Sequence, residues 1–212
     1  MKRSERVAIV DAVLQREIGD VPIPLDHRDP FTLLVAVVLS AQCTDARVNL
    51  VTPALFDAAP TPAALAKMAP EQILPYIASC GLAPTKARNL AALGRQLVTL
   101  HGGQVPSDEA ALEALPGVGH KTASVVRVQS FGIPAFPVDT HVARLANRWG
   151  LSKAKAVGPI EADLRKAWPA REWGRVHLQM VTAGRRFCPA LRHDALRCPV
   201  CAALAEAGGG GV

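Results

Sequence analysis

Residues 113–127 read Glu-Ala-Leu-Pro-Gly-Val-Gly-His-Lys-Thr-Ala-Ser-Val-Val-Arg, and after an apolar continuation residues 137–141 read Pro-Val-Asp-Thr-His. Gly117 and Gly119 permit a sharp reversal of the chain and close approach of another molecule to the backbone. Such a turn directs backbone N–H groups outward beside the positive end of the following helix. Its natural ligand is therefore a phosphate group, and nothing in it is suited to reading bases.

Two helices are predicted on either side of this turn, forming a hairpin over residues 108–131. The first has Ser107 as its candidate N-cap, runs over residues 108–115 and ends at Pro116; the second begins near His120. A Pro-Gly-x-Gly turn between two helices is common, so the turn alone does not separate nucleic-acid binding from an ordinary helix connection.

The string Leu-Pro-Gly-Val-Gly-His-Lys-Thr-Ala, with Asp139 eighteen residues after Lys121, resembles the helix-hairpin-helix DNA glycosylases, specifically the endonuclease III family. The resemblance extends from near residue 5 to residue 201. It implies an all-α fold with two helical domains flanking a DNA-binding cleft. Residues 22–134 would form the hairpin-bearing domain, and residues 1–21 with 135–212 would form the second.

Composition agrees with a helical protein that binds a polyanion. The chain has 212 residues and a net charge of +6, and half of its residues are apolar while only 4% are aromatic, which suits close helix packing. The run 31–40 is ambiguous locally, because its β-branched residues would also suit a buried strand, but the lack of partner strands and the family resemblance favour a helix. Helical segments are predicted from Val7 to near Gly19 and over 49–57, 61–67, 71–78, 85–100, 140–149, 158–168 and 171–186.

Lys121 and Asp139 are the predicted catalytic residues. A lysine at the positive end of a helix has its charged form disfavoured, which makes its amine a better nucleophile. In the resembled family this amine attacks the sugar C1′, forms a Schiff base and cuts the strand by β-elimination. A carboxylate at Asp139 would stabilise positive charge on the sugar, although an Asp at this place is also an ordinary helix N-cap.

An enzyme of this kind must extrude the target nucleotide and fill the space left behind. By resemblance, Gln42 would enter that space and Leu82 would intercalate, although core packing is the simpler interpretation of Leu82. Lys86 and Arg144 are candidate phosphate contacts that could equally be solvated. The predicted DNA-binding residues are thus Gln42, Leu82, Lys86, Leu115, Gly117, Val118, Gly119 and Arg144.

Cys188, Cys198 and Cys201 lie close together near the C-terminus, at spacings of nine and two intervening residues, and predict a metal site. In the family this segment holds a [4Fe-4S] cluster with four cysteines. Here the first gap is longer, and Ala207 stands where the fourth cysteine is expected. Candidate fourth ligands are His193, Asp194 and Glu206. The [4Fe-4S] cluster is favoured, zinc is the alternative, and an empty or degenerate site is the third interpretation. The tail after Cys201 is expected to be mobile.

The predicted function is therefore a bifunctional DNA glycosylase and abasic-site lyase acting on duplex DNA with oxidised pyrimidines or abasic sites. The alternatives are a non-catalytic helix-hairpin-helix DNA-binding protein and a monofunctional mismatch or adenine glycosylase, although relatives of the latter kind typically lack a lysine at the position of Lys121. The longest apolar run is too short to span a bilayer, and the N-terminus lacks a signal-peptide h-region. We expect a cytoplasmic, nucleoid-associated monomer.

Overall fold

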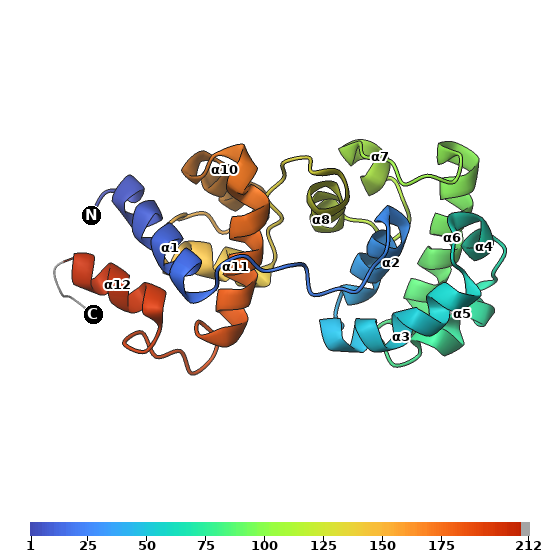
Figure 1. The fold of residues 1–212 in the computed structure, drawn as a ribbon, viewed down its shortest axis with the longest axis horizontal. Coiled ribbons are helices and arrows are strands. Elements are labelled where there is room, and N and C mark those ends of the chain that lie inside the picture. The colour runs from blue at the N-terminus through green and yellow to red at the C-terminus, as the bar shows by residue number, and fades with distance from the viewer. Residues whose placement is uncertain (209–212) are drawn as a thin grey trace. The chain divides into compact units, whose positions relative to one another are not determined.

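The computed structural model describes residues 1–208 and divides them into two compact units. One unit is Pro24–Ile133, and the other combines Met1–Ile23 with the chain from Pro134 onward. Residues 1–208 contain helices and loops but no strand, so the predicted all-α class is confirmed (Figure 1). No helix among these residues is both long and apolar enough to cross a membrane.

The unit Pro24–Ile133 is built around helix α2 (Pro30–Ser40), the run whose sequence was ambiguous. A helix is favoured locally because Pro30 occupies its first turn and Asp29 caps it, accepting a hydrogen bond from the Thr32 amide at 2.8 Å. Every residue from Phe31 to Leu39 is buried, which explains why the segment shows no amphipathic pattern.

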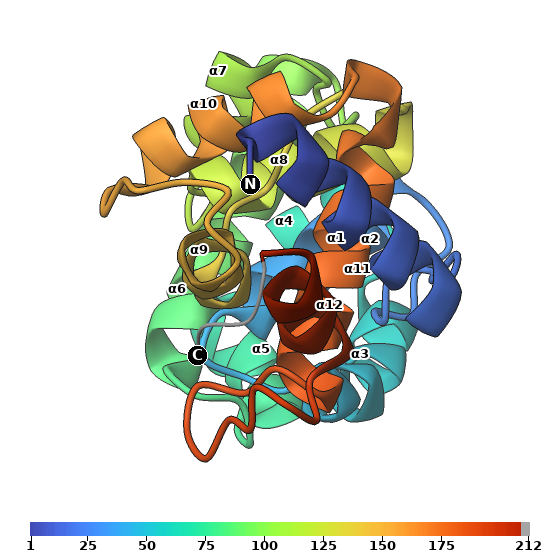
Figure 2. The ribbon, with the colours of Figure 1, turned by 90° about the vertical axis from the view of Figure 1, so that its left-hand side faces the viewer.

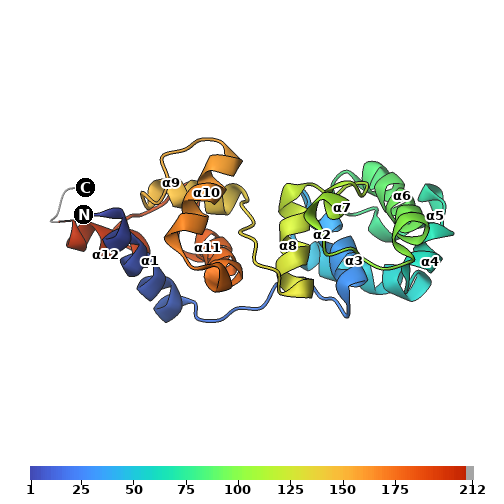
Figure 3. The same cartoon turned by 90° about the horizontal axis from the view of Figure 1, so that it is seen from above.

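Six further helices complete this unit. They are α3 (Asp45–Ala58), α4 (Pro62–Ala66), α5 (Pro70–Ile77), α6 (Ala83–His101), α7 (Glu109–Glu113) and α8 (His120–Phe131). Helix α6 packs against α4 and α5, whereas α2 packs against α3 and α8 (Figure 3). Helix α8, which carries Lys121, is thereby supported from behind by the most apolar helix of the unit.

The second unit joins the two ends of the chain. Its helices are α1 (Arg3–Glu17), α9 (Thr140–Arg148), α10 (Val157–Ala167), the 3-10 helix η1 (Ala170–Glu172), α11 (Trp173–Arg186) and α12 (Pro199–Ala207). Helix α1 packs against α11 and α12, and α9 packs against α10 and α11 (Figure 2). Their shared core includes the fully buried side chains of Trp149, Phe136 and Leu14.

Two local expectations were wrong. The first hairpin helix is capped by Asp108, whose carboxylate accepts a hydrogen bond from the Ala111 amide at 2.9 Å, rather than by Ser107. The tail after Cys201 was expected to be mobile, but α12 continues to Ala207, because Pro199 starts the helix and Leu204 is buried against the core. Residues 209–212, also part of that tail, lie outside the described residues.

Candidate active site and metal centre

The hairpin turn requires glycine at Gly117 and leaves open space at Gly119. Gly117 has a φ of +81°, and a Cβ added there would come within 2.9 Å of the Asn89 side-chain nitrogen. Gly119 is extended, and a Cβ there would meet nothing within 4 Å. The absence of a side chain at Gly119 is therefore not needed for packing, but it leaves the backbone open to an approaching ligand.

The turn distributes its amides between internal bonds and solvent. The Leu115 amide donates to the Leu112 carbonyl and the Val118 amide to the Leu115 carbonyl, at 3.0 and 3.1 Å. The side chains of Leu115 and Val118 are buried, so predicting them as DNA contacts was wrong: both anchor the turn from inside. The amides of Gly117 and Gly119 have no hydrogen-bond partner within residues 1–208, and both glycines are exposed.

Lys121 is exposed at the second position of α8, directly after this turn. Its side chain makes no hydrogen bond or ion pair with any other described residue. Next to it, the His120 Nδ1 atom lies 3.1 Å from a Glu109 carboxylate oxygen and 2.7 Å from one of Glu113. Arg127 also pairs with Glu109. These contacts fasten α7 to α8 and hold the hairpin in place around an unengaged amine.

Gln42 and Leu82, the predicted wedges, occupy two adjoining loops of the same unit. Both residues are exposed and have left-handed backbones, with φ of 53° and 60°. The loops touch at Gly81, where a Cβ would lie 2.6 Å from the Gln42 carbonyl oxygen. Positive φ costs free energy in residues of this size, and such strain is concentrated at functional sites. Simple core packing of Leu82 is ruled out by its 55% exposure.

Lys86 is not a phosphate contact, and this prediction was wrong. The residue is only 4% exposed, and its Nζ donates hydrogen bonds to the carbonyl oxygens of Leu39 and Ala41 at 2.8 and 2.6 Å. Burial lowers the pKa of Lys86, while neighbouring Cys43 and Cys80 oppose that shift. Lys86 therefore secures the end of α2, immediately before Gln42, to helix α6.

Asp139 is the N-cap of α9. One carboxylate oxygen, Oδ1, accepts a hydrogen bond from the Val142 amide at 2.8 Å, so the helix-capping interpretation is confirmed. Its second oxygen has no partner among residues 1–208 and is left for another role. Burial lowers the pKa of the neighbouring His141, against the opposing effect of the Asp139 charge. Lys121 and Asp139 belong to different units.

Arg144 was predicted to contact phosphate, but the structure places it elsewhere. Its Nη2 donates to the carbonyl oxygens of Gly184 and Cys188 at 3.1 and 3.0 Å, and its Nε is buried. One turn later, the Arg148 Nη1 atom donates to the Pro189 carbonyl at 2.8 Å and lies 3.2 Å from the Cys188 sulfur. Both arginines therefore hold the cysteine-bearing loop rather than face solvent. The sequence offered one signal of this, their shared helix face at a spacing of four residues.

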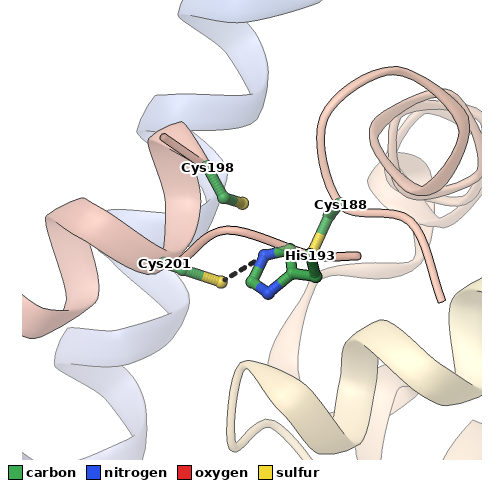
Figure 4. A group of neighbouring side chains, drawn as sticks. All are labelled: Cys188, His193, Cys198 and Cys201. Carbon is green, nitrogen blue, oxygen red and sulfur yellow. Dashed lines mark hydrogen bonds between the residues drawn. The ribbon is translucent and has the colours of Figure 1, made fainter. Parts of the chain in front are cut away.

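Three cysteines and one histidine gather in the C-terminal loop. Ligand atoms of Cys188, His193, Cys198 and Cys201 all lie within 4.8 Å of one another (Figure 4). The Cys201 Sγ and His193 Nε2 atoms are 3.5 Å apart. Hydrogen bonds involving the other two cysteines lower the pKa of Cys188, and Arg148 acts in the same direction. The group is compatible with a bound metal centre, because clustered thiols next to an imidazole are typical soft-metal ligands.

The donor set fits the expected [4Fe-4S] cluster in number but not in spacing. Iron atoms stand between the thiolates of such a cluster, so its outer ligand atoms are roughly 6 Å apart. Here all four donors lie closer together than 4.8 Å, and one is an imidazole nitrogen. The side chains as they lie enclose too small a space for a four-iron cluster.

Comparison with known proteins defines the class. Residues 35–170 match the model of the HhH-GPD superfamily base excision DNA repair protein. A solved structure of a thermostable thymine-DNA glycosylase is similar in fold, with a TM-score of 0.80 at 20% identity, over 93% of each chain. The fold and the hairpin therefore define a base excision DNA repair protein of this superfamily.

Relatives with higher sequence identity identify the family within this superfamily. The chain is 47% identical to endonuclease III of Treponema pallidum (strain Nichols) over 82% of each protein. It is 41% identical to endonuclease III of Escherichia coli (strain K12), over 95% of this chain and 93% of that protein. A trapped endonuclease III–DNA covalent intermediate matches with a TM-score of 0.89 at 40% identity, over 94% of each chain. The chain belongs to the endonuclease III family, bifunctional DNA glycosylases and abasic-site lyases of base excision repair.

Proposed function

We propose that this protein excises oxidised or fragmented pyrimidines from double-stranded DNA and cuts the strand at the resulting abasic site, with Lys121 as the nucleophile. The observation that carries the proposal is the exposed amine of Lys121, without a partner among residues 1–208, directly after a turn with two free glycine amides. Structures of endonuclease III bound to DNA, both covalently and non-covalently, support a nucleic-acid ligand. The preference for pyrimidines rests on the family resemblance.

In the proposed reaction, the neutral Nζ of Lys121 attacks C1′ and the C1′–N bond breaks, so that the base leaves with the bonding electrons and takes up a proton. The amine loses a proton, the sugar ring opens, and a Schiff base joins C1′ to Nζ. Removal of a proton from C2′ then expels the 3′ phosphate by β-elimination. Water finally hydrolyses the Schiff base and regenerates Lys121.

Asp139 would assist by charge. Positive charge develops on the sugar as the base leaves, and a carboxylate close to it lowers the energy of that state. The carboxylate oxygen left over from helix capping is suited to this role, and capping itself restrains the side chain. In this proposal one aspartate both ends a helix and supports catalysis.

Gln42 and Leu82 would act on the duplex. Extruding a nucleotide requires something to replace its stacking and pairing, and apolar side chains commonly wedge between base steps. Two exposed side chains on strained, touching loops are suited to this work. Phosphates near the extruded nucleotide would be held by the amides of Gly117 and Gly119.

We further propose that the protein acts as a monomer on chromosomal DNA, and hence in the cytoplasm at the nucleoid. Its C-terminal group would hold a metal centre with a structural role, because base removal and β-elimination require no electron transfer. A [4Fe-4S] cluster and a zinc ion are the two candidates that the sequence offers.

Borohydride trapping tests the proposal. Purified protein is mixed with a duplex that holds one thymine glycol, reductant is added, and a denaturing gel is examined for a covalent adduct. Wild type and Lys67→Gln, which replaces another exposed lysine of the same unit, should form the adduct, whereas Lys121→Gln should form none and still bind the duplex.

An adduct that persists in Lys121→Gln would rule out this nucleophile. Failure of the wild-type protein to form an adduct with either thymine glycol or abasic DNA, with binding retained, would instead indicate a monofunctional glycosylase or a non-catalytic DNA-binding protein.

A further inference from the structure

We propose that the C-terminal loop binds a single tetrahedrally coordinated metal ion, best matched by Zn²⁺, through Cys188, His193, Cys198 and Cys201. His193 would take the place of the missing fourth cysteine. The inference concerns the metal and its ligands only, and it holds or fails independently of the DNA chemistry of Lys121.

Donor spacing is the first argument. Zinc bonds of about 2.3 Å to sulfur and about 2.0 Å to nitrogen place tetrahedral donors about 3.5–3.8 Å apart. The Cys201 Sγ to His193 Nε2 distance is 3.5 Å, and no pair among the four donors exceeds 4.8 Å. A single ion therefore fits with small side-chain adjustments, whereas a four-iron cluster would require every donor to move outward. Three thiolates and one imidazole are also a common donor set of structural zinc sites.

The competing fourth ligands are excluded by their positions. Asp194 is not among the gathered ligands, and its Oδ1 accepts hydrogen bonds from the amides of Leu196 and Arg197, at 3.0 and 3.4 Å, in a turn that leads into Cys198. Glu206 is exposed on the last turn of α12 and is not among the gathered ligands. Figure 4 shows the His193 ring between Cys188 and Cys201, on the three-residue-longer loop that distinguishes this chain from the family pattern.

Charge and access agree with this assignment. A zinc ion with three thiolates and a neutral imidazole carries one net negative charge. The guanidinium of Arg148 would offset that charge, because its Nη1 atom lies 3.2 Å from the Cys188 sulfur. A hollow of about 500 Å³, lined in part by Arg6, Arg148, His193 and Cys201, reaches two of the four ligands. Zinc can enter and leave by this route, and a chelator can reach the site.

Metal analysis of the wild-type protein is the primary test. The full chain is expressed with iron and zinc both supplied, purified without oxygen, and analysed for metal content and visible absorption. We expect one zinc per chain and no iron–sulfur absorption. Replacement by Co²⁺ should give the intense visible bands of a tetrahedral thiolate site. Four irons per chain, or octahedral cobalt spectra, would overturn the proposal.

Two variants of His193 and two control variants test the role of His193. His193→Ala should weaken zinc binding, measured by competition with a chromophoric chelator, by about a hundredfold or more. His193→Cys should restore tight binding as a four-cysteine site. The control variants Asp194→Asn and Glu206→Ala should bind zinc within about threefold of wild type. Unchanged affinity in His193→Ala, or a large loss in either control, would show that His193 is not the fourth ligand.

Discussion

Replacing Lys86 by methionine tests how the loops that carry Gln42 and Leu82 are held in place. Methionine keeps the length and most of the volume of lysine but removes both hydrogen bonds to the carbonyl oxygens of Leu39 and Ala41. Each buried carbonyl left unsatisfied costs about 1–3 kcal/mol. Relief from burying a charged ammonium offsets part of this cost, so we expect a net loss of about 1–3 kcal/mol in the free energy of unfolding.

For a chain of this size, each kcal/mol corresponds to about 2–4 °C, which gives a fall in Tm of about 2–12 °C by calorimetry. Activity should report the local effect. Because Ala41 directly precedes Gln42, Lys86→Met should slow excision of thymine glycol more than cleavage of abasic DNA, whose nucleotide is easier to extrude.

The matched control is Arg88→Met, which removes an exposed cation from the same helix. It should leave Tm and the ratio of the two activities unchanged. If Lys86→Met had the Tm of wild type and lost both activities equally, the buried lysine would not be what positions Gln42, and the reasoning would fail.

Two further predictions concern the same loops and the hairpin turn. Gly81→Ala places a Cβ 2.6 Å from the Gln42 carbonyl oxygen, so it should lower stability by about 1–3 kcal/mol and impair excision. A Cβ at Gly119 would meet no atom, so Gly119→Ala should alter stability by less than about 0.5 kcal/mol in denaturant titrations. It should nevertheless weaken duplex binding. Equal losses of stability from the two substitutions would contradict this contrast. The last prediction follows from the lowered pKa of Lys86. Between that pKa and the unfolded value of 10.5, the unfolded chain binds more protons than the folded chain does. The contribution of Lys86 to stability therefore rises with pH in this window. The difference in unfolding free energy between wild type and Lys86→Met should therefore grow with pH in that window, and a constant or shrinking difference would refute the assignment.

Local sequence chemistry predicted the features that depend on neighbouring residues. The start of α8 near His120, the turn at Gly117 and the capping by Asp139 all follow from conformational preferences within a few positions. The N-cap of α7 was misplaced by one residue, because Ser107 and Asp108 have similar capping propensities and only the observed bond to the Ala111 amide separates them.

Features that depend on distant contacts could not be predicted. Lys86 is chemically indistinguishable from a surface lysine until the carbonyls of Leu39 and Ala41, more than forty residues earlier, are placed beside it. Arg144 shares a helix face with Arg148, but that pattern does not indicate that its partners lie forty residues onward. His193 was one of three candidate ligands. It is distinguished from the neighbouring Asp194 because a hydrogen bond from the Leu196 amide engages the Asp194 side chain within the loop.

Helix α9 links two parts of its unit in nine residues. It begins at the Asp139 cap, and its later turns hold the cysteine-bearing loop through Arg144 and Arg148. If the proposed metal fixes that loop, a chain without the metal would keep the Asp139 cap, because the bond from the Val142 amide is local, but would lose a firm anchor for the two arginines. Binding of the proposed metal would then change the stability of α9 and its loop while leaving the capped carboxylate in place.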